Sequence, residues 1–557
     1  MPTKGGFRLV GEQPPLSVCC RSPSIRLSAS IAGRTARRLV LLADFLRPLR
    51  RLSAMQISVN RGRLEACRAA AHTLVLGALV VFAFGILVYW LRVDESVIQE
   101  MNAADFQRDF WTHFIKDSRR ARVELAVNDL PHFSREVGSC GRWYENETRN
   151  WRYDEARKWA FDGDSFLDYQ LGKKKKCSAL IEKFAFLEEP LSVEEADYPL
   201  AYGMIVYQNA AQVYYSLSSI YQPQNAYCIA VDGKSTPEFK RRMHDLADCL
   251  PHVTVIDMEE LGWCWNSVLD ALYSCFSNLT LSQHPWRYYQ ENFPLHSSAY
   301  VLRLQYFTGF DVPLKTNLEM VRIFKQLNGT VVTEVLTDRP RHPVTENVLP
   351  LWKAGMSALI PREAARFAVG NKLVNQTVEH LIHAPYNVHR VCPDELLWAT
   401  IFGNKKLVPA PGSFEAADFY RKLVGEKPQI ARRSQQPPAS NFTPSAAEPF
   451  WPHRYMISRF QIWDDNPEVC HGQMTHRSCS YGLGDVHQLV QRSELVAHKF
   501  HLDVEPAAYF CMWKFIRERA LDPLQEKFRG HSYRRIAHAR VNAGESLTGM
   551  SVYFTEN

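Results

Sequence analysis

Two adjacent carboxylates stand near the start of the stretch CPDELLWATI, residues 392–401. Asp394 and Glu395 follow Pro393 and are followed at once by apolar and aromatic residues. Proline and acidic residues are both favoured in the first turn of a helix, so either acid can act as a helix-stabilising charge. A carboxylate at the edge of an apolar core can also accept a proton from a substrate hydroxyl as a general base. The residues alone leave both roles open.

Strands and helices that could position such acids alternate between residues 201 and 257. The pattern predicts strands at 201–207, 226–232 and 253–257, separated by helices at 209–221 and 235–250. This alternation predicts an α/β fold with a parallel sheet covered on both faces, in which ligands bind at the carboxyl ends of the strands. Asp232 ends the second strand and is expected at that edge. The unit lacks the glycine-rich motifs of dinucleotide, P-loop and α/β-hydrolase sites, but a nucleotide-sugar enzyme needs none of them.

The rest of the chain is less regular. Residues 353–369 read as a strand followed by a helix, and residues 392–403 read as the start of another helix. Residues 425–450 are rich in proline and serine and are expected to form a loop. Beyond residue 516 the chain is basic and without a clear pattern.

An uncharged apolar run covers residues 73–91 and, as a helix, would span roughly 28 Å of hydrocarbon. Arginines precede it and acids follow it, which places the N-terminus in the cytosol and the rest in the secretory lumen. A buried helix or a cleaved signal peptide fits less well, and Met55 is an alternative start. The predicted organisation is a cytosolic tail at 1–72, a membrane signal-anchor at 73–91, a lumenal stem at 92–195, a catalytic domain at 196–516 and a basic tail at 517–557.

Charge, cysteines and glycosylation signals agree with this topology. The formal charge is +7, but residues 1–68 hold thirteen basic and three acidic residues, so the remainder is near −3 and does not favour a nucleic-acid partner. Ten of the thirteen cysteines follow the apolar run, where disulfides persist. The Asn-x-Ser/Thr signals also follow it, at Asn146, Asn278, Asn328, Asn375 and Asn441.

An ordered set of motifs between residues 177 and 515 resembles the core-2/I-branching β-1,6-N-acetylglucosaminyltransferases, which are type II Golgi enzymes. The set is AYGMIVY, IYQPQNAYCIAVDGKS, GFDVPLKTN, CPDELLWATI, HRSCSYGLGD and AHKFHLDVEP. The resemblance implies a glycosyltransferase fold of the GT-A type, UDP-GlcNAc as donor, an O-glycan core as acceptor, inversion at the anomeric carbon and catalysis without a divalent metal or other cofactor.

The resemblance also assigns roles. It implies that Glu395 is the catalytic base and that Asp394 serves the structure. Arg477 and Lys499 match basic residues that hold the donor diphosphate, since fixed cations can stabilise that charge. Ile205, Tyr207 and Asp232 match donor-binding positions, although Asp232 could instead cap the turn before Gly233.

The acceptor side matches the family less closely. Glu334 and Arg341 are possible acceptor-binding residues, but a convincing lysine is missing between them. Trp263 and Trp265 could stack on a sugar, but a place in the core is favoured. Residues 291–305 interrupt what is one continuous strand in the family, as a surface elaboration or a wrongly translated segment.

Metal-dependent relatives use an Asp-x-Asp motif, and Asp162 to Asp164 is the one such motif in this sequence. It precedes the first predicted strand, so a metal role is disfavoured. Zinc-type cysteine spacing is absent. The resemblance instead implies disulfides, with Cys264 and Cys392 free and the pairs Cys140–Cys511, Cys177–Cys249, Cys228–Cys275 and Cys470–Cys479.

We therefore expect a transferase of GlcNAc to a 6-hydroxyl of an O-glycan core, anchored in the Golgi membrane. A related transferase that uses another donor, such as UDP-xylose, remains an alternative because the sequence does not indicate which residues contact the donor sugar. A catalytically silent glycan-binding scaffold is the alternative from another class. The oligomeric state is not indicated.

Overall fold

The computed structural model describes residues 118–145, 153–171, 176–262, 264–282, 304–336, 347–385, 391–434, 457–464, 468–475, 477–522 and 527–552. The chain divides into Met1–Phe106 and Gln107–Asn557, and all described residues belong to the second unit. Among them, no helix has the length and apolar character needed to cross a membrane. The membrane span expected at 73–91 and the alternative start at Met55 lie outside the described residues.

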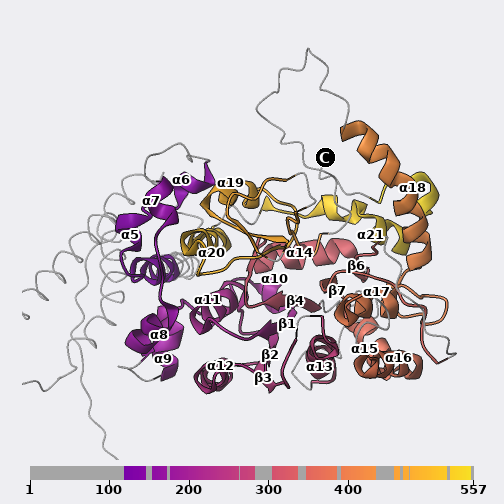
Figure 1. Ribbon diagram of the computed structural model, residues 1–557, viewed down its shortest axis with the longest axis horizontal. Helices are drawn as coiled ribbons and strands as arrows, with labels where there is room; N and C mark the ends of the chain where they lie inside the picture. The colour runs from indigo at the N-terminus through magenta and orange to yellow at the C-terminus, as the bar shows by residue number, and fades with distance from the viewer. Residues whose placement is uncertain are drawn as a thin grey trace, which may run out of the picture. The chain divides into compact units, whose positions relative to one another are not determined.

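A four-stranded parallel sheet forms the centre of the fold (Figure 1). Its order is β3-β2-β1-β4, with β1 (Ala201–Val206), β2 (Ala226–Val231), β3 (Val253–Asp257) and β4 (Leu304–Thr308). Helices α11 (Ala210–Ile220) and α12 (Pro237–Cys249) connect the first three strands. The predicted alternation of strands and helices is confirmed. Because Leu304 pairs with Ala201, the last two residues of the interrupting segment 291–305 belong to β4, and residues 291–303 lie outside the described residues.

The sheet separates two apolar layers because alternate residues of each strand point to opposite faces. Tyr202, Met204 and Ile229 face the layer that contains α11 and α12. Cys228 and Ala230 face the layer that contains α13 (Asn266–Leu281), α15 (Arg362–Gly370) and α16 (Lys372–His383). Both faces are thus buried, as a parallel sheet requires.

Short two-stranded sheets surround the central one. They pair β5 (Asp311–Pro313) with β10 (Val496–His498), β6 (Val332–Thr333) with β7 (Ala358–Leu359), and β8 (Gln473–Thr475) with β9 (Ser478–Ser480). Helix α14 (Asn317–Leu327) begins with a capping box, in which Thr316 and Glu319 each accept the other's backbone N–H. Two short helical turns follow β9, namely η2 (Leu483–Asp485) and α19 (Val486–Leu489).

The expected stem is largely part of the globular fold. Residues 118–128 are helical, and Val123, Trp143 and Phe184 are buried in the same apolar layer as α11. The helices of this segment are α5 (Phe133–Glu136), α6 (Gly141–Tyr144), α7 (Tyr153–Arg157), α8 (Gly163–Leu171), α9 (Lys176–Lys183) and α10 (Val193–Ala196). The segment is polar on average, so its sequence did not indicate that a few large apolar residues pack it against the core.

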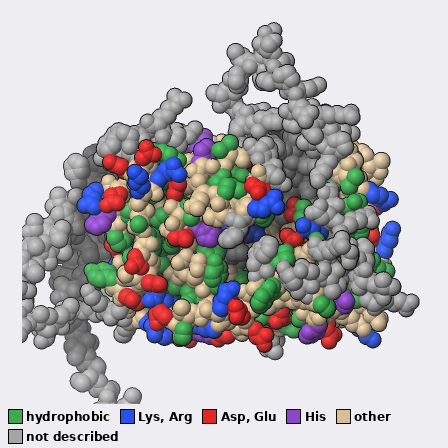
Figure 2. All heavy atoms as spheres, in the orientation of Figure 1, with side chains coloured by type: hydrophobic (Ala, Val, Ile, Leu, Met, Phe, Trp, Pro, Cys, Tyr) green, Lys and Arg blue, Asp and Glu red, His purple; other side chains and the backbone are tan. Residues whose placement is uncertain are grey.

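The basic tail expected at 517–557 is also structured, so the expectation of a segment without features is wrong. Helix α20 (Pro506–Ala520) is followed by η4 (His531–Arg535), α21 (Ala537–Asn542) and η5 (Leu547–Gly549). Tyr533, Met550 and Val552 are buried, so the tail packs into the domain, whereas Arg534 and Arg535 remain exposed. Figure 2 shows positive and negative side chains interspersed on the visible face.

The first ten residues of the loop expected at 425–450 are helical, so the expectation is wrong for them. Helix α18 (Ala416–Ser434) continues through residue 434 although it contains Pro428. A single proline removes one helical hydrogen bond, and good helix formers on both sides can compensate for it. Residues 435–450 lie outside the described residues.

Five disulfides connect the described residues. Four are the pairs named from the resemblance: Cys140–Cys511, Cys177–Cys249, Cys228–Cys275 and Cys470–Cys479. The fifth joins Cys264 to Cys392, so the expectation that these two cysteines are free is wrong. They are 128 residues apart and become neighbours only when the chain folds.

Three of the glycosylation signals can be placed. Asn278, Asn328 and Asn375 are exposed, whereas Asn146 and Asn441 lie outside the described residues. Glycosylation at these sites stays a prediction.

We predict that replacing both Cys264 and Cys392 by serine lowers the free energy of unfolding by about 2–4 kcal/mol, because the bond closes a long loop. Denaturant unfolding measures the change. Thiol labelling of the unmodified protein provides the control: if either cysteine reacts with a maleimide under native, non-reducing conditions, the assignment of this bond is wrong.

We predict that His538 makes the fold sensitive to acid. Its ring lies 4.9 Å from that of Phe414 and 4.3 Å from that of Phe419, and burial lowers its pKa from 6.5 to about 3. The folded state keeps it neutral while the unfolded state takes up a proton below about pH 6.5, so stability is lost as the pH falls from 6.5 towards 3. His538→Leu should remove about 2 kcal/mol of the decline in unfolding free energy between pH 7.5 and 5, measured in urea. An unchanged decline would refute this.

Candidate active site

The carboxyl edge of the sheet holds Tyr207 and Asp232, each directly after a strand. The Asp232 backbone N–H donates to the carbonyl of Val206 at 3.0 Å, and the Ser235 hydroxyl donates to the carbonyl of Tyr207 at 2.9 Å. Tyr207 is 37% exposed as a residue, whereas Ile205 packs against the α13 layer. The structure therefore brings Tyr207 and Asp232 together, as parallel strand ends must.

The carboxylate of Asp232 binds its own loop. Its Oδ1 accepts the backbone N–H groups of Lys234 and Leu261, both at 3.0 Å, and its Oδ2 lies 3.1 Å from the Lys234 ammonium. That ammonium lies 5.8 Å from the centroid of the Tyr207 ring, within cation–π range. Lys234 was missed in the sequence, where its signal is a lysine two residues after a strand-ending aspartate.

A hairpin of β8 and β9 brings Arg477 and Lys499 to one place. Arg477 occupies its turn with a φ of 64°, and its guanidinium donates to both carboxylate oxygens of Asp464 at 2.9 and 3.0 Å. The Lys499 ammonium donates to the carbonyl of Thr475 on the same hairpin at 3.1 Å. Burial and the charge of Arg459 lower the pKa of Lys499. One cation thus lies in the turn of a short, disulfide-bonded hairpin, and the other, which follows β10, binds the same hairpin.

A buried cluster of charged and titratable side chains adjoins Lys499, since one of its members, His498, directly precedes the lysine. His498 Nδ1 lies 2.6 Å from a carboxylate oxygen of Asp311, which is fully buried, and Arg459 lies 3.6 Å from the same oxygen. Burial lowers the pKa of His498 to about 4, and the charge of Arg459 contributes in the same direction. The sequence argument did not identify these three residues. The one signal was that His498 directly precedes Lys499.

Phe310 connects this group to the sheet edge. Its ring lies 5.5 Å from that of Tyr207, and its carbonyl accepts the backbone N–H of Phe500 at 2.8 Å. The segment carrying Lys499 therefore lies beside the segment carrying Tyr207. This arrangement suits a ligand with a ring at one end and negative charge at the other.

The paired acids lie on the short helical turn η1 (Pro393–Leu396), which leads into α17 (Leu397–Phe402). The Glu395 side chain is 32% exposed and lies 3.4 Å from the Lys353 ammonium. Asp394 is buried, and its Oδ1 has no hydrogen-bond partner among the described residues. Burial, with the charge of Glu395 in second place, raises the pKa of Asp394 to about 7. Both acids lie in the first turn directly after Pro393, the position in which they can act as helix-stabilising charges, whereas the N-cap residue Cys392 makes no side-chain capping bond.

The segment 353–355 brings Glu334 and Glu395 together. The Ala354 N–H donates to the carbonyl of Glu395 at 2.7 Å, and a carboxylate oxygen of Glu334 lies 2.9 Å from the place where a Cβ on Gly355 would stand. Gly355 therefore leaves room for the Glu334 carboxylate. Lys353 was missed because it is far from the acids in the sequence.

Trp265 is 50% exposed, so the favoured place in the core is wrong for this residue. It precedes α13 and lies against Gly262, whose missing side chain leaves room for the indole. The neighbouring Cys264 forms a disulfide with Cys392, three residues before Glu395. The exposed indole therefore lies on a segment that is covalently joined to η1, the turn that carries Asp394 and Glu395 and is called the acid turn below. Trp263 and Arg341 lie outside the described residues.

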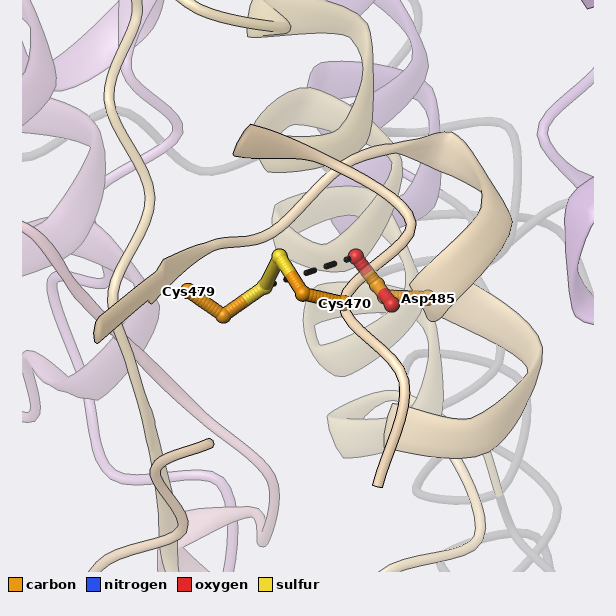
Figure 3. A group of neighbouring side chains, drawn as sticks. All are labelled: Cys470, Cys479 and Asp485. Carbon is orange, nitrogen blue, oxygen red and sulfur yellow. Dashed lines mark hydrogen bonds between the residues drawn. A yellow bond between two sulfur atoms is a disulfide. The ribbon is translucent and has the colours of Figure 1, made fainter. Parts of the chain in front are cut away.

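Two candidate metal-binding groups have structural roles. Asp162 accepts the backbone N–H groups of Asp164 and Ser165 at the start of α8, and Asp164 pairs with Arg242 at 2.6 Å. In the part of the chain that the structure describes, Cys470, Cys479 and Asp485 also lie close together (Figure 3). The two sulfurs are bonded to each other, so the group offers a single carboxylate.

Comparison with known proteins identifies the fold around these residues. The profile of the Core-2/I-Branching enzyme family matches residues 200–411, which include both the sheet edge and the acid turn. This part of the chain therefore carries a Core-2/I-Branching enzyme domain, and the chain is similar to glycosyltransferases that share it.

Curated relatives of the core-2/I-branching domain extend the match. A β-1,3-galactosyl-O-glycosyl-glycoprotein β-1,6-N-acetylglucosaminyltransferase of Homo sapiens is 27% identical over 381 residues, 64% of this chain and 79% of the relative. An N-acetyllactosaminide β-1,6-N-acetylglucosaminyl-transferase of Mus musculus is 26% identical over 63% of this chain and 80% of its own. A third, β-1,3-galactosyl-O-glycosyl-glycoprotein β-1,6-N-acetylglucosaminyltransferase 3 of Ovis aries, is 27% identical over 63% and 75%.

We predict that Asp232→Ala lowers the free energy of unfolding by about 2–3 kcal/mol, because it leaves the backbone N–H groups of Lys234 and Leu261 without their acceptor. Urea unfolding in the absence of nucleotide measures this, with Asp248→Ala, an exposed aspartate of α12 that pairs with Lys176, as a control for loss of an ion-paired aspartate. If Asp232→Ala is as stable as the parent, its carboxylate is not needed to hold the loop.

Proposed function

We propose that this protein transfers GlcNAc from UDP-GlcNAc to a 6-hydroxyl of an O-glycan core, with inversion and without a divalent metal. The observation that carries the proposal is that the matched region contains both the sheet edge with Asp232 and the turn with Glu395. The names of the relatives describe β-1,6-N-acetylglucosaminyl transfer in each case.

The donor would lie along the sheet edge. Tyr207 and Asp232 with its loop would hold the nucleoside, with Ile205 supporting the strand end from within. The diphosphate would then reach the hairpin, where Lys499 and Arg477 would stabilise the negative charge of the departing UDP. Arg477 is 74% exposed and its bond to Asp464 is a surface pair, so the guanidinium can turn to a diphosphate at little cost.

The acceptor would lie against the acid turn. Glu395 would take the proton of the 6-hydroxyl as the oxygen attacks the anomeric carbon, while the bond from that carbon to the diphosphate oxygen breaks. Glu334 and the exposed ring of Trp265 would contact the acceptor sugar, and the position of both on segments joined to this turn supports that role.

We also propose that the protein is a single-pass type II Golgi membrane protein with a lumenal catalytic domain. The apolar run at 73–91 and the basic residues before it support this topology. The five disulfides support an oxidising compartment for the described residues.

The test is transfer by the full-length chain from UDP-GlcNAc to Galβ1,3GalNAc in the presence of EDTA. We predict product with a β-1,6 linkage, and a fall in kcat of about 10²–10⁴ for Glu395→Gln, because the amide cannot take the hydroxyl proton. Glu363→Gln, an exposed glutamate on α15, is the matched control and should behave like the parent. Activity with UDP-xylose alone would favour another donor, and a folded protein inactive with all donors and acceptors would indicate a scaffold.

A further inference from the structure

The adjacent carboxyls of Asp394 and Glu395 raise the question of which one carries a proton. Both lie on η1, and the negative charge of one opposes ionisation of the other. A general base must be ionised when the acceptor binds. The distribution of charge around the pair therefore decides whether Glu395 can act.

The surroundings of the two acids differ. Asp394 is buried and one of its oxygens has no hydrogen-bond partner among the described residues, an environment that favours the neutral acid. Glu395 is partly exposed and lies 3.4 Å from the Lys353 ammonium, an environment that favours the carboxylate. Lys353 is itself mostly buried, with a side chain 17% exposed, so solvent screens this pair less than a surface pair.

Glu334 is a further charged group near this turn, because its carboxylate lies against Gly355, next to Ala354. Its negative charge would oppose ionisation of Glu395, as that of Asp394 does. The Lys353 cation counters both. Its backbone is fixed as well, because the carbonyl of Lys353 accepts the N–H of Leu336 at 2.8 Å and Ala354 bonds to Glu395.

We propose that Lys353 is a positioning residue that holds Glu395 as the carboxylate and leaves the shared proton on Asp394. The inference rests on the proposed function of Glu395 as base and extends it to a lysine outside the acid motif. In the transfer step the hydroxyl proton moves to Glu395, the new carbon–oxygen bond forms, and UDP leaves with the electron pair. Glu395 then returns its proton to solvent, and Lys353 restores the carboxylate for the next turnover.

The pH dependence of kcat/KM for the acceptor tests this in the full-length chain. Loss of the cation should raise the pKa of Glu395, so Lys353→Met should move the acid limb of the profile upward by roughly one pH unit. Lys353→Arg keeps the charge and should leave the limb near its parental position. Lys405→Met, an exposed lysine just beyond α17, is the matched control and should change nothing.

Asp394→Asn tests the other half of the proposal. The amide resembles the neutral acid, so the variant should remain active with an acid limb at or below that of the parent. A limb that moves upward in this variant would overturn the assignment of the proton to Asp394.

A Lys353→Met limb at the parental pH would overturn the role of Lys353, even if its activity falls, because a purely structural loss does not move the limb. Thermal unfolding and UDP binding check that each variant is folded, and Lys353→Gln, which also removes the charge, replaces Lys353→Met if that variant does not fold. Full activity of Glu395→Gln would instead refute the base itself. The two failures are therefore distinguishable.

Discussion

A parallel sheet must be covered on both faces, and this constraint determines where the chemistry of this protein can lie. With α11 and α12 on one side and α13 on the other, the open part of the sheet is its carboxyl edge. Tyr207 and Asp232 lie there because they are the first residues after β1 and β2. The second apolar layer also fixes the acid turn, because η1 packs against α13, which in turn packs against β1 and β2.

Covalent bonds reinforce the same arrangement at the points where loops carry functional groups. Cys228–Cys275 joins β2 to α13, Cys264–Cys392 joins the segment before α13 to the acid turn, and Cys470–Cys479 closes the loop before the Arg477 hairpin. Site residues from loops are less constrained by packing than those on strands. The disulfides thus supply, near the acid turn and the hairpin, a rigidity that packing supplies at the sheet edge.

The regular part of the fold was accessible from sequence, because periodicity reports burial on one or both faces. The predicted strand at 253–257 matches β3, and the helix expected at 209–221 matches α11 within a residue at each end. The segments before residue 195 and after residue 516 were misjudged because sparse anchors such as Trp143 and Tyr533 carry no periodic signal. Contacts between segments far apart in the chain could not be predicted from local sequence patterns either, as the pairs Cys264–Cys392 and Lys353–Glu395 illustrate.

The charges of the site are arranged in pairs whose strengths differ, and the difference follows from burial. The Arg477–Asp464 pair is exposed, so it contributes little to stability and gives way readily to another anion. Asp311 is fully buried between His498 and Arg459, so separating that group would leave an uncompensated charge inside the protein. Because His498 adjoins Lys499, the buried group fixes the backbone from which the lysine extends. The geometry thus combines one exposed cation whose surface pair can rearrange with another that is held in place.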